Sequence, residues 1–248
     1  MRIFVLALFL AMISASPALA SVCDDWNTLD KEIRDGKIDR KEAKRKIIEL
    51  DKLLLEEYTG KIGNSPFFFP IKGYGRKSAG DTRGSSYKPA GYNFYDGNRH
   101  GGHPAHDLFI RDRGRTGLDD RTGKPAEIVA FADGVVVAVN PSWEYPNGIR
   151  GGIYIWIFNP ESNRYYYYAH LAKILVAPGD IVKAGDTIAL LGRTGKNAYP
   201  KRSPTHIHFM CLSFDGGAMK PVNTWRELPD DGKSRPVAAD RKESATRE

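Results

Sequence analysis

Residues 153–158 read Ile-Tyr-Ile-Trp-Ile-Phe, and residues 164–170 read Arg-Tyr-Tyr-Tyr-Tyr-Ala-His. Aromatic and β-branched residues fill the first run and four tyrosines stand in the second, and such residues favour a pleated, half-buried surface. Both runs are therefore predicted to be β-strands. Alternate tyrosines of a strand face opposite sides, so one pair of Tyr165–Tyr168 is expected in the core and the other partly exposed. A platform for substrate is the alternative role for these tyrosines.

The surrounding sequence continues this β pattern from Leu108 to Trp225. Short apolar runs separated by turn signals are typical of an antiparallel sandwich or partial barrel. Residues 60–102 are rich in Gly, Ser, Pro and Asn, and are expected to form loops around short strands, opening with Phe67–Ile71. The further runs expected to be strands are 107–110, 128–139 with an Asp133-Gly134 turn, 181–182, 187–191 and, as the last one, 206–214.

A short helical segment is predicted before this β domain, at Cys23–Tyr58. Asp39 followed by Glu42 has the spacing of a capping box, and Gly36 is expected to separate a short first helix from a longer second one. Apolar residues recur at steps of three and four, which predicts one buried stripe: Ala43, Ile47, Leu50, Leu54 and Tyr58.

The two ends of the chain differ from the rest in composition. Residues 1–20 combine Arg2, an apolar run and a small-residue site at Ala18-Leu19-Ala20, which predicts a signal peptide. The protein is therefore expected to be exported to the periplasm or the cell exterior, with no membrane span. We divide the chain into residues 1–20, a helical segment at 21–60, the β domain at 61–226 and a polar tail at 227–248, expected to be disordered.

Charge and cysteine content limit the partners. The net charge is +7, which suits anionic polymers such as wall glycans or simply keeps the surface solvated. No basic helix with interleaved aromatics is present, so nucleic acid is not expected. Val22 before Cys23 argues against a lipid anchor. Cys23 and Cys211 are either a disulfide of an exported protein or two unrelated thiols.

The six histidines all lie between residues 100 and 208, in the β part of the chain. His206 and His208 are two apart on a predicted strand, so both imidazoles point to one face while Ile207 points to the core. His103 and Asp107 add an imidazole and a carboxylate from a loop that enters a strand, since Pro104 disfavours a helix. Together these residues predict a metal site.

The order of motifs resembles the M23 peptidases, the family of lysostaphin- and LytM-like zinc endopeptidases. The resemblance covers roughly residues 67–225, and Ala105 departs from it where the family has Gly. The matching motifs are His103-Pro-Ala-His-Asp107, Ala132-Asp-Gly-Val-Val136, Tyr168-Ala-His-Leu171, Val182-Lys-Ala-Gly-Asp186, Leu191-Gly-Arg-Thr-Gly195 and His206-Ile-His208.

This resemblance implies an M23/LytM-like fold and one Zn²⁺ ion held by His103, Asp107 and His208. It also implies that His170 and His206 are catalytic, and that the substrate is a cross-link or stem peptide of peptidoglycan. Three protein ligands leave a fourth position for water, as a catalytic zinc site requires. The two catalytic histidines would accept the water's proton, stabilise the oxyanion or protonate the leaving amine, in an order that the sequence leaves open.

The same sequence features are consistent with other functions. An M23-like module that binds wall or activates an enzyme without cutting is the main one. A structural zinc site would need a fourth ligand, and Cys211 is expected on the opposite face of its strand. His100 and His106 are expected to be spare histidines, His106 with a supporting role near the metal as its alternative. An inhibitory cover for the cleft is an alternative role for residues 23–98.

Overall fold

The computed structural model describes residues 21–79, 86–230 and 234–235. The predicted signal peptide at 1–20 lies outside the described residues, as do positions 231–233 and 236–248 of the predicted tail. The rest of that tail differs from the prediction. Leu228 is fully buried in the core, and Glu227 accepts two hydrogen bonds of 2.9 Å from Arg164. These residues are therefore part of the domain, because the apolar Leu228 side chain belongs to its core.

Two helices open the described chain, α1 (Val22–Arg34) and α2 (Arg40–Tyr58). Between them Gly36 has φ of 67°, a conformation that suits glycine. Asp39 caps α2 by accepting from the backbone N–H groups of Lys41 and Glu42. The Glu42 carboxylate accepts from Arg45 instead of returning to the cap. The capping box of this structure is at α1, where Ser21 and Asp24 bond reciprocally.

Nine strands form one antiparallel sheet in the described part of the chain, with two short 3-10 helices before them. The main path of the sheet runs β1-β8-β5-β4-β3-β6, with β9 beside β8, and with β7 joining β5 to β2. The elements are η1 (Arg76–Ser78), η2 (Phe94–Arg99), β1 (Ala105–Phe109), β2 (Glu127–Val129), β3 (Gly134–Asn140), β4 (Ile153–Asn159), β5 (Arg164–Ile174), β6 (Ile181–Val182), β7 (Thr187–Leu191), β8 (His206–Asp215) and β9 (Ala218–Val222).

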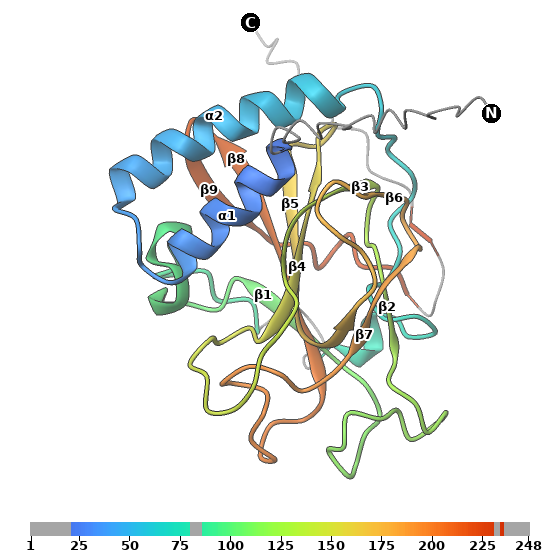
Figure 1. The fold of residues 1–248 in the computed structure, drawn as a ribbon. Coiled ribbons are helices and arrows are strands. Elements are labelled where there is room, and N and C mark those ends of the chain that lie inside the picture. Colours follow the sequence, from blue (N-terminus) through green and yellow to red (C-terminus); the bar gives the residue numbers. More distant parts are fainter. Residues whose placement is uncertain (1–20, 80–85, 231–233, 236–248) are drawn as a thin grey trace, which may run out of the picture.

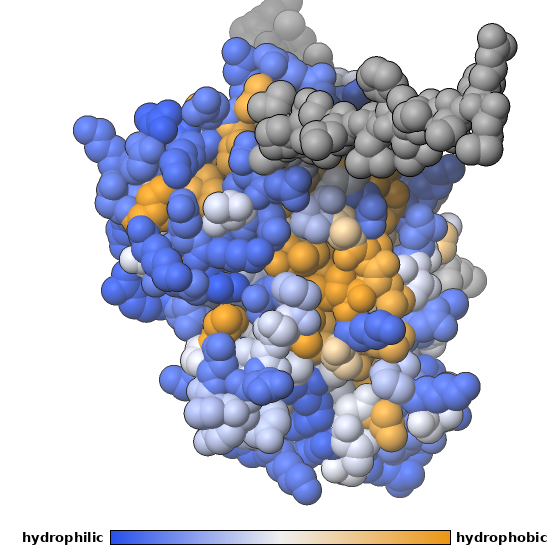
Figure 2. All heavy atoms as spheres, viewed as in Figure 1, coloured by the Kyte–Doolittle hydropathy of each residue, from blue (hydrophilic) through white to orange (hydrophobic). Residues whose placement is uncertain are grey.

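The sheet separates two apolar cores. One core lies inside the curl of the sheet, where β2 and β7 fold back over the central strands. The other lies between the opposite face and the two helices, which cross the top of the sheet in Figure 1. The predicted stripe of α2 is buried in this second core. Figure 2 shows that the outward surface of the helical layer is mainly hydrophilic, as an amphipathic helix pair requires. The predicted β-sheet partial barrel behind a helical segment is confirmed.

The helical layer corrects the expectation for the four tyrosines. Tyr166 and Tyr168 belong to the core inside the curl, whereas Tyr165 lies under the helices, where Trp26 stacks on it at 5.5 Å. Tyr167, at the edge of that layer, is half-buried. Both faces of β5 are thus covered except at Tyr167, which lines a cleft, so no exposed tyrosine pair remains as a platform.

Two short elements were not as predicted. Strand β9 was missed because Pro221 disfavours a strand, yet β9 pairs with β8 alone, and an edge strand tolerates proline. Gly216 and Gly217, both at positive φ, make the tight turn between these strands. Residues 67–71 form isolated bridges, Phe67 with Arg235 and Ile71 with Ile128, rather than a strand.

The two cysteines are free thiols. Cys23 lies under the helices and Cys211 lies inside the curl, so the sheet separates them. The disulfide alternative is therefore wrong. Among the described residues, no helix is long and apolar enough to cross a membrane.

A buried carboxyl couples the helical layer to the sheet and gives a first prediction. Asp51 of α2 accepts a hydrogen bond of 2.7 Å from the hydroxyl of Tyr165, and burial raises its pKa to about 6 from 3.8. Between about pH 4 and pH 6 the folded chain holds a proton that the unfolded chain has released, so this group lowers the free energy of unfolding as pH rises. Asp51→Asn keeps an acceptor for Tyr165 and does not titrate. Its stability relative to wild type should therefore increase from pH 4 to pH 6 and level off above.

Urea unfolding at pH 4, 5, 6 and 7 measures this difference. Glu56→Gln, at an exposed position of the same helix, is the matched control. A stability difference between Asp51→Asn and wild type that stays constant or shrinks over this range would contradict the assignment.

Candidate metal centre and cleft

Two adjacent strands bring a carboxylate and two imidazoles to one face of the sheet. Asp107 of β1 is the register partner of His208 of β8, and His206 lies two residues earlier on the same strand and face. This is the face that carries the helices farther along the sheet, since Ala105 and Met210 of the same strands belong to the core beneath them.

His103 reaches the same place from the loop before β1. Its backbone exchanges two hydrogen bonds with Lys88, of 2.6 and 2.8 Å, which holds the loop against a neighbouring segment. Gly102 has φ of 68°, and a Cβ there would lie 2.6 Å from the carbonyl oxygen of Ala90. Glycine at this position therefore lets the two backbones approach closely enough to place His103.

Two imidazole nitrogens converge on one carboxylate oxygen. His103 Nε2 lies 3.2 Å and His208 Nδ1 lies 3.1 Å from Asp107 Oδ1, and one ligand atom from each of the three lies within 4.8 Å of the others. Atoms bound tetrahedrally to zinc at roughly 2.0–2.2 Å lie roughly 3.3–3.6 Å apart. The observed separations from the carboxylate are close to this value, so the cluster has the size of a zinc site.

The second nitrogen of His103 supports the same conclusion. His103 Nδ1 lies 3.0 Å from the carbonyl oxygen of Ser86, while Nε2 faces the carboxylate of Asp107. A neutral imidazole donates from only one nitrogen. The Ser86 carbonyl oxygen and the Asp107 carboxylate are therefore both satisfied in two cases. Either His103 is an imidazolium, or a cation lies between Nε2 and the carboxylate. A ligating histidine that donates its other N–H to a carbonyl is the usual arrangement around protein-bound metals.

Electrostatics favour the charge states that a cation needs at Asp107 and His208, but they favour a proton on His103. Burial opposes ionisation of Asp107, but hydrogen bonds with His103 and His208 hold its pKa well below 3.8. Burial lowers the pKa of His208. The hydrogen bond with Asp107 raises the pKa of His103. An ionised carboxylate and unprotonated imidazole nitrogens are the forms that bind metal.

The two histidines predicted to be catalytic, His170 and His206, lie beside the cluster. The rings of His170 and His206 are 4.9 Å apart, and His206 Nε2 lies 3.8 Å from Asp107 Oδ1. His170 Nδ1 donates to the carbonyl oxygen of Thr194, and His206 Nδ1 donates to that of Pro204, both at 2.8 Å. Each Nε2 is therefore the nitrogen left to exchange a proton. Burial holds the pKa of His170 well below 6.5, which keeps it neutral near pH 7.

A backbone irregularity aims His170 at the cluster. Its φ is 67°, and the pairing of β4 with β5 shifts register around it. Strict alternation would place His170 with Tyr166 and Tyr168, inside the curl of the sheet. The bulge turns its side chain to the face of Asp107 instead, as bulges beside active sites commonly do.

Of the other residues considered in the sequence analysis, His106 and Cys211 lie away from the cluster and His100 lies beside it. His106 is buried on the opposite face of β1, with Nε2 3.2 Å from Asn223 Oδ1. Cys211 also lies on the opposite face, as expected, so it is no fourth ligand. His100, in contrast, lines the same cleft as the cluster, and its ring packs on Tyr92.

The cleft around the cluster has an empty volume of about 670 Å³, partly open to solvent. Helices α1 and α2 contribute no residue to its lining among those described, so they do not cover it. Sequence reasoning missed several lining residues that come from loops and carry no motif: Gly102, Arg150, Gly151, Asn197 and Ser203.

The antiparallel β domain gathers two histidines and an aspartate around one point, with two more histidines beside them, and this arrangement suits a metal-binding site. Residues 113–221 match the family model described as "Peptidase family M23". This region of the chain is therefore similar to peptidase family M23.

Curated relatives agree with this family. The chain is 32% identical over 144 residues to a protein of Haemophilus influenzae named as an uncharacterized metalloprotease, covering 57% of this chain and 27% of that one. It is 34% identical over 116 residues to the murein hydrolase activator NlpD of Escherichia coli, with coverage of 47% and 26%. It is 38% identical over 98 residues to the peptidoglycan DD-endopeptidase ShyB of Vibrio cholerae, with coverage of 39% and 20%.

The chain thus spans about a quarter of the length of these relatives. Among solved structures, a zinc-containing peptidase from Vibrio cholerae aligns with 24% identity and a TM-score of 0.42, covering 65% of this chain and 40% of that one.

Proposed function

We propose that this protein is a zinc-dependent endopeptidase that hydrolyses cross-links or stem peptides of bacterial peptidoglycan. The observation that carries the proposal is the convergence of His103 Nε2 and His208 Nδ1 on the same oxygen of Asp107. His103, Asp107 and His208 would hold one Zn²⁺ ion. The ion would polarise the scissile carbonyl and lower the pKa of an attacking water.

The protein's own side chains then perform the proton transfers. His170 is neutral and buried, and its Nδ1–H is fixed on Thr194, so its Nε2 is placed to take a proton. His206 is fixed in the same way on Pro204 and lies nearer the carboxylate. We assign His170 as the general base, and His206 as the group that stabilises the oxyanion or protonates the leaving amine.

Wall peptides are the proposed substrate because relatives of this domain are named for murein and peptidoglycan. Export is part of the proposal and rests on the pattern of residues 1–20. A basic net charge of +7 suits an anionic wall.

Digestion of purified peptidoglycan tests the proposal directly. The protein should release peptide fragments whose masses identify the bond cut. A chelator should abolish release, and added zinc should restore it. The alternative of a non-cleaving wall-binding or activating module predicts binding to the sacculus with no fragments in any metal condition, and that result would replace the proposal.

A further inference from the structure

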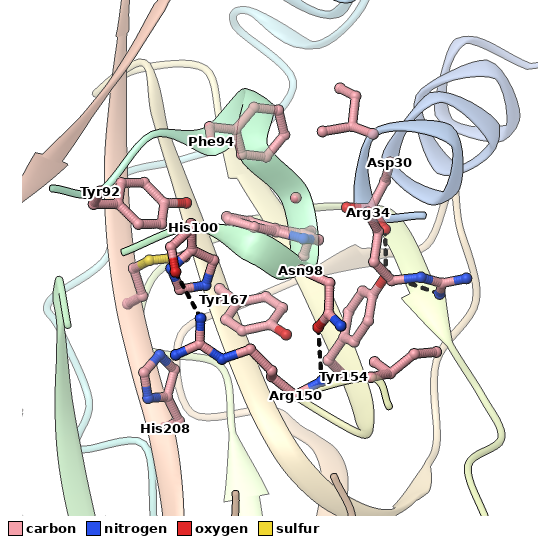
Figure 3. A pocket seen from close by; sticks show the side chains of 16 residues that line it. Asp30, Arg34, Tyr92, Phe94, Asn98, His100, Arg150, Tyr154, Tyr167 and His208 are labelled. Carbon is pink, nitrogen blue, oxygen red and sulfur yellow. Dashed lines mark hydrogen bonds between the residues drawn. The ribbon is translucent and has the colours of Figure 1, made fainter. Parts of the chain in front are cut away.

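A second cavity opens beside the metal cluster, on the side of the helices. Figure 3 shows it between α1, the segment around η2 and strands β4, β5 and β8. It has an empty volume of about 550 Å³, part of which is open to solvent, and it shares His208, Tyr167 and Arg150 with the cleft. Much of its wall comes from α1 and residues 92–100, which lie outside the matched family region.

The backbone that carries Arg150 is held from several sides. The Asn98 side chain accepts a hydrogen bond from the backbone N–H of Arg150 at 2.8 Å, which Figure 3 marks with a dashed line. It also donates to the Gly148 carbonyl at 2.9 Å. The Ile149 carbonyl accepts from the N–H of Lys196 at 3.0 Å. The backbone position of Arg150 is therefore fixed by the fold before any ligand arrives, which lowers the cost of binding.

Within the described part of the chain, the Arg150 guanidinium donates one hydrogen bond, which leaves its other N–H donors free. Its Nη1 donates to the His100 carbonyl at 2.7 Å, and among the described residues no carboxylate forms an ion pair with it. Arg34, in the same cavity, is different, since it forms two hydrogen bonds with Asp35. An arginine guanidinium is planar, and its paired N–H donors match the two oxygens of a carboxylate. Arg150 lies where the cavity and the cleft meet, since it lines both.

The other walls of the cavity suit a peptide that carries such a carboxylate. Phe94, Trp156 and Met210 give it apolar walls. Tyr92 and Tyr167 also line it, and their hydroxyls have no hydrogen bond within the described part of the molecule. Apolar walls with a few convergent polar groups are typical of a ligand pocket.

We infer that Arg150 binds a carboxylate of the substrate peptide, on a residue next to the scissile bond, and thereby selects acidic peptides over neutral ones. The inference rests on the proposed function for the cleft. Arg150 is a specificity residue in it, with Tyr92 and Tyr167 as further donors. Peptides without a carboxylate near the cut, such as glycine bridges, would be poor substrates.

Chemical amidation of the wall tests this inference in a kinetic experiment. Purified peptidoglycan is used as such and after its carboxylates are converted to carboxamides with a carbodiimide and ammonia. Wild type should release fragments ~10- to 100-fold more slowly from the amidated wall, the range expected for loss of a charge-assisted pair. Arg150→Gln should be slowed by a similar factor on the native wall and be insensitive to amidation. Arg150→Lys should recover part of the preference, and Arg111→Gln, an exposed arginine, controls for net charge.

A binding measurement separates this inference from the proposed function. Soluble stem peptide without cross-links, in carboxylate and carboxamide forms, is titrated into the full chain by calorimetry. A preference for the carboxylate form that Arg150→Gln removes supports the inference even if no wall is cut. Equal binding of the two forms, or equal cleavage of the two walls by wild type, overturns it. Cleavage of both walls at one rate would leave the proposed function standing.

Discussion

Replacing Asp107 with alanine is expected to abolish stoichiometric zinc binding and to lower wall hydrolysis by ~10³-fold or more. The carboxylate oxygen is the atom on which His103 and His208 converge, so its removal leaves two neutral ligands and no compensating charge. Loss of the ion removes several kcal/mol of transition-state stabilisation, which corresponds to a rate factor of this size. Zinc content by atomic emission and fragment release from peptidoglycan measure the two effects.

Asp215→Ala is the matched control for this variant. Asp215 is an exposed aspartate at the far end of β8, the strand that also carries His208. It should keep both zinc and activity. An Asp107→Ala protein that binds one zinc ion per chain as tightly as wild type would refute the proposed ligand set.

Replacing His170 with alanine should lower the rate of cleavage by ~10²- to 10⁴-fold, the usual contribution of a general base, while zinc content stays at one ion per chain. The ring lies beside the cluster and its Nε2 is its free nitrogen. Added imidazole should restore part of the activity, because a small base can enter the space that the side chain leaves. The measurement is kcat for wall or peptide cleavage, with and without imidazole, on protein of known zinc content.

His106→Gln is the comparison variant, because His106 lies on the opposite face of β1 and contacts Asn223. It should retain most of the activity if it folds. Loss of zinc in His170→Ala would show that His170 is a ligand, and an unchanged kcat would show that it takes no part in the reaction.

Regular geometry explains why part of the candidate metal site could be expected from sequence. Side chains two apart on a strand share a face, so His206 and His208 were expected together, and β1 then supplied Asp107 as the direct neighbour of His208. His170 could be linked to the site only through the family motif. Its place in strand alternation points to the core, and only the bulge at φ of 67° turns it outward. Sequence periodicity carries no signal for a backbone bulge of this kind.

Long-range packing explains what else escaped prediction. The exposure of Tyr165 depends on the helical layer that lies over it, and no local pattern of β5 reports that layer. Arg150 lies in a loop without a motif, and its place at the cleft depends on Asn98 from a distant segment. Residues of this kind are set by tertiary contacts rather than by their neighbours in sequence.

The helical layer has a consequence for anyone who shortens this protein to the region that matches the family. The family match begins at residue 113, yet Trp26 packs on Trp156 and Tyr165, and Asp30 accepts the hydroxyl proton of Tyr154. A fragment that lacked α1 would leave these aromatic rings in water and would lose one side of the cavity beside the metal cluster. A fragment that keeps both apolar cores is therefore larger than residues 113–221 and has to begin at the first helix.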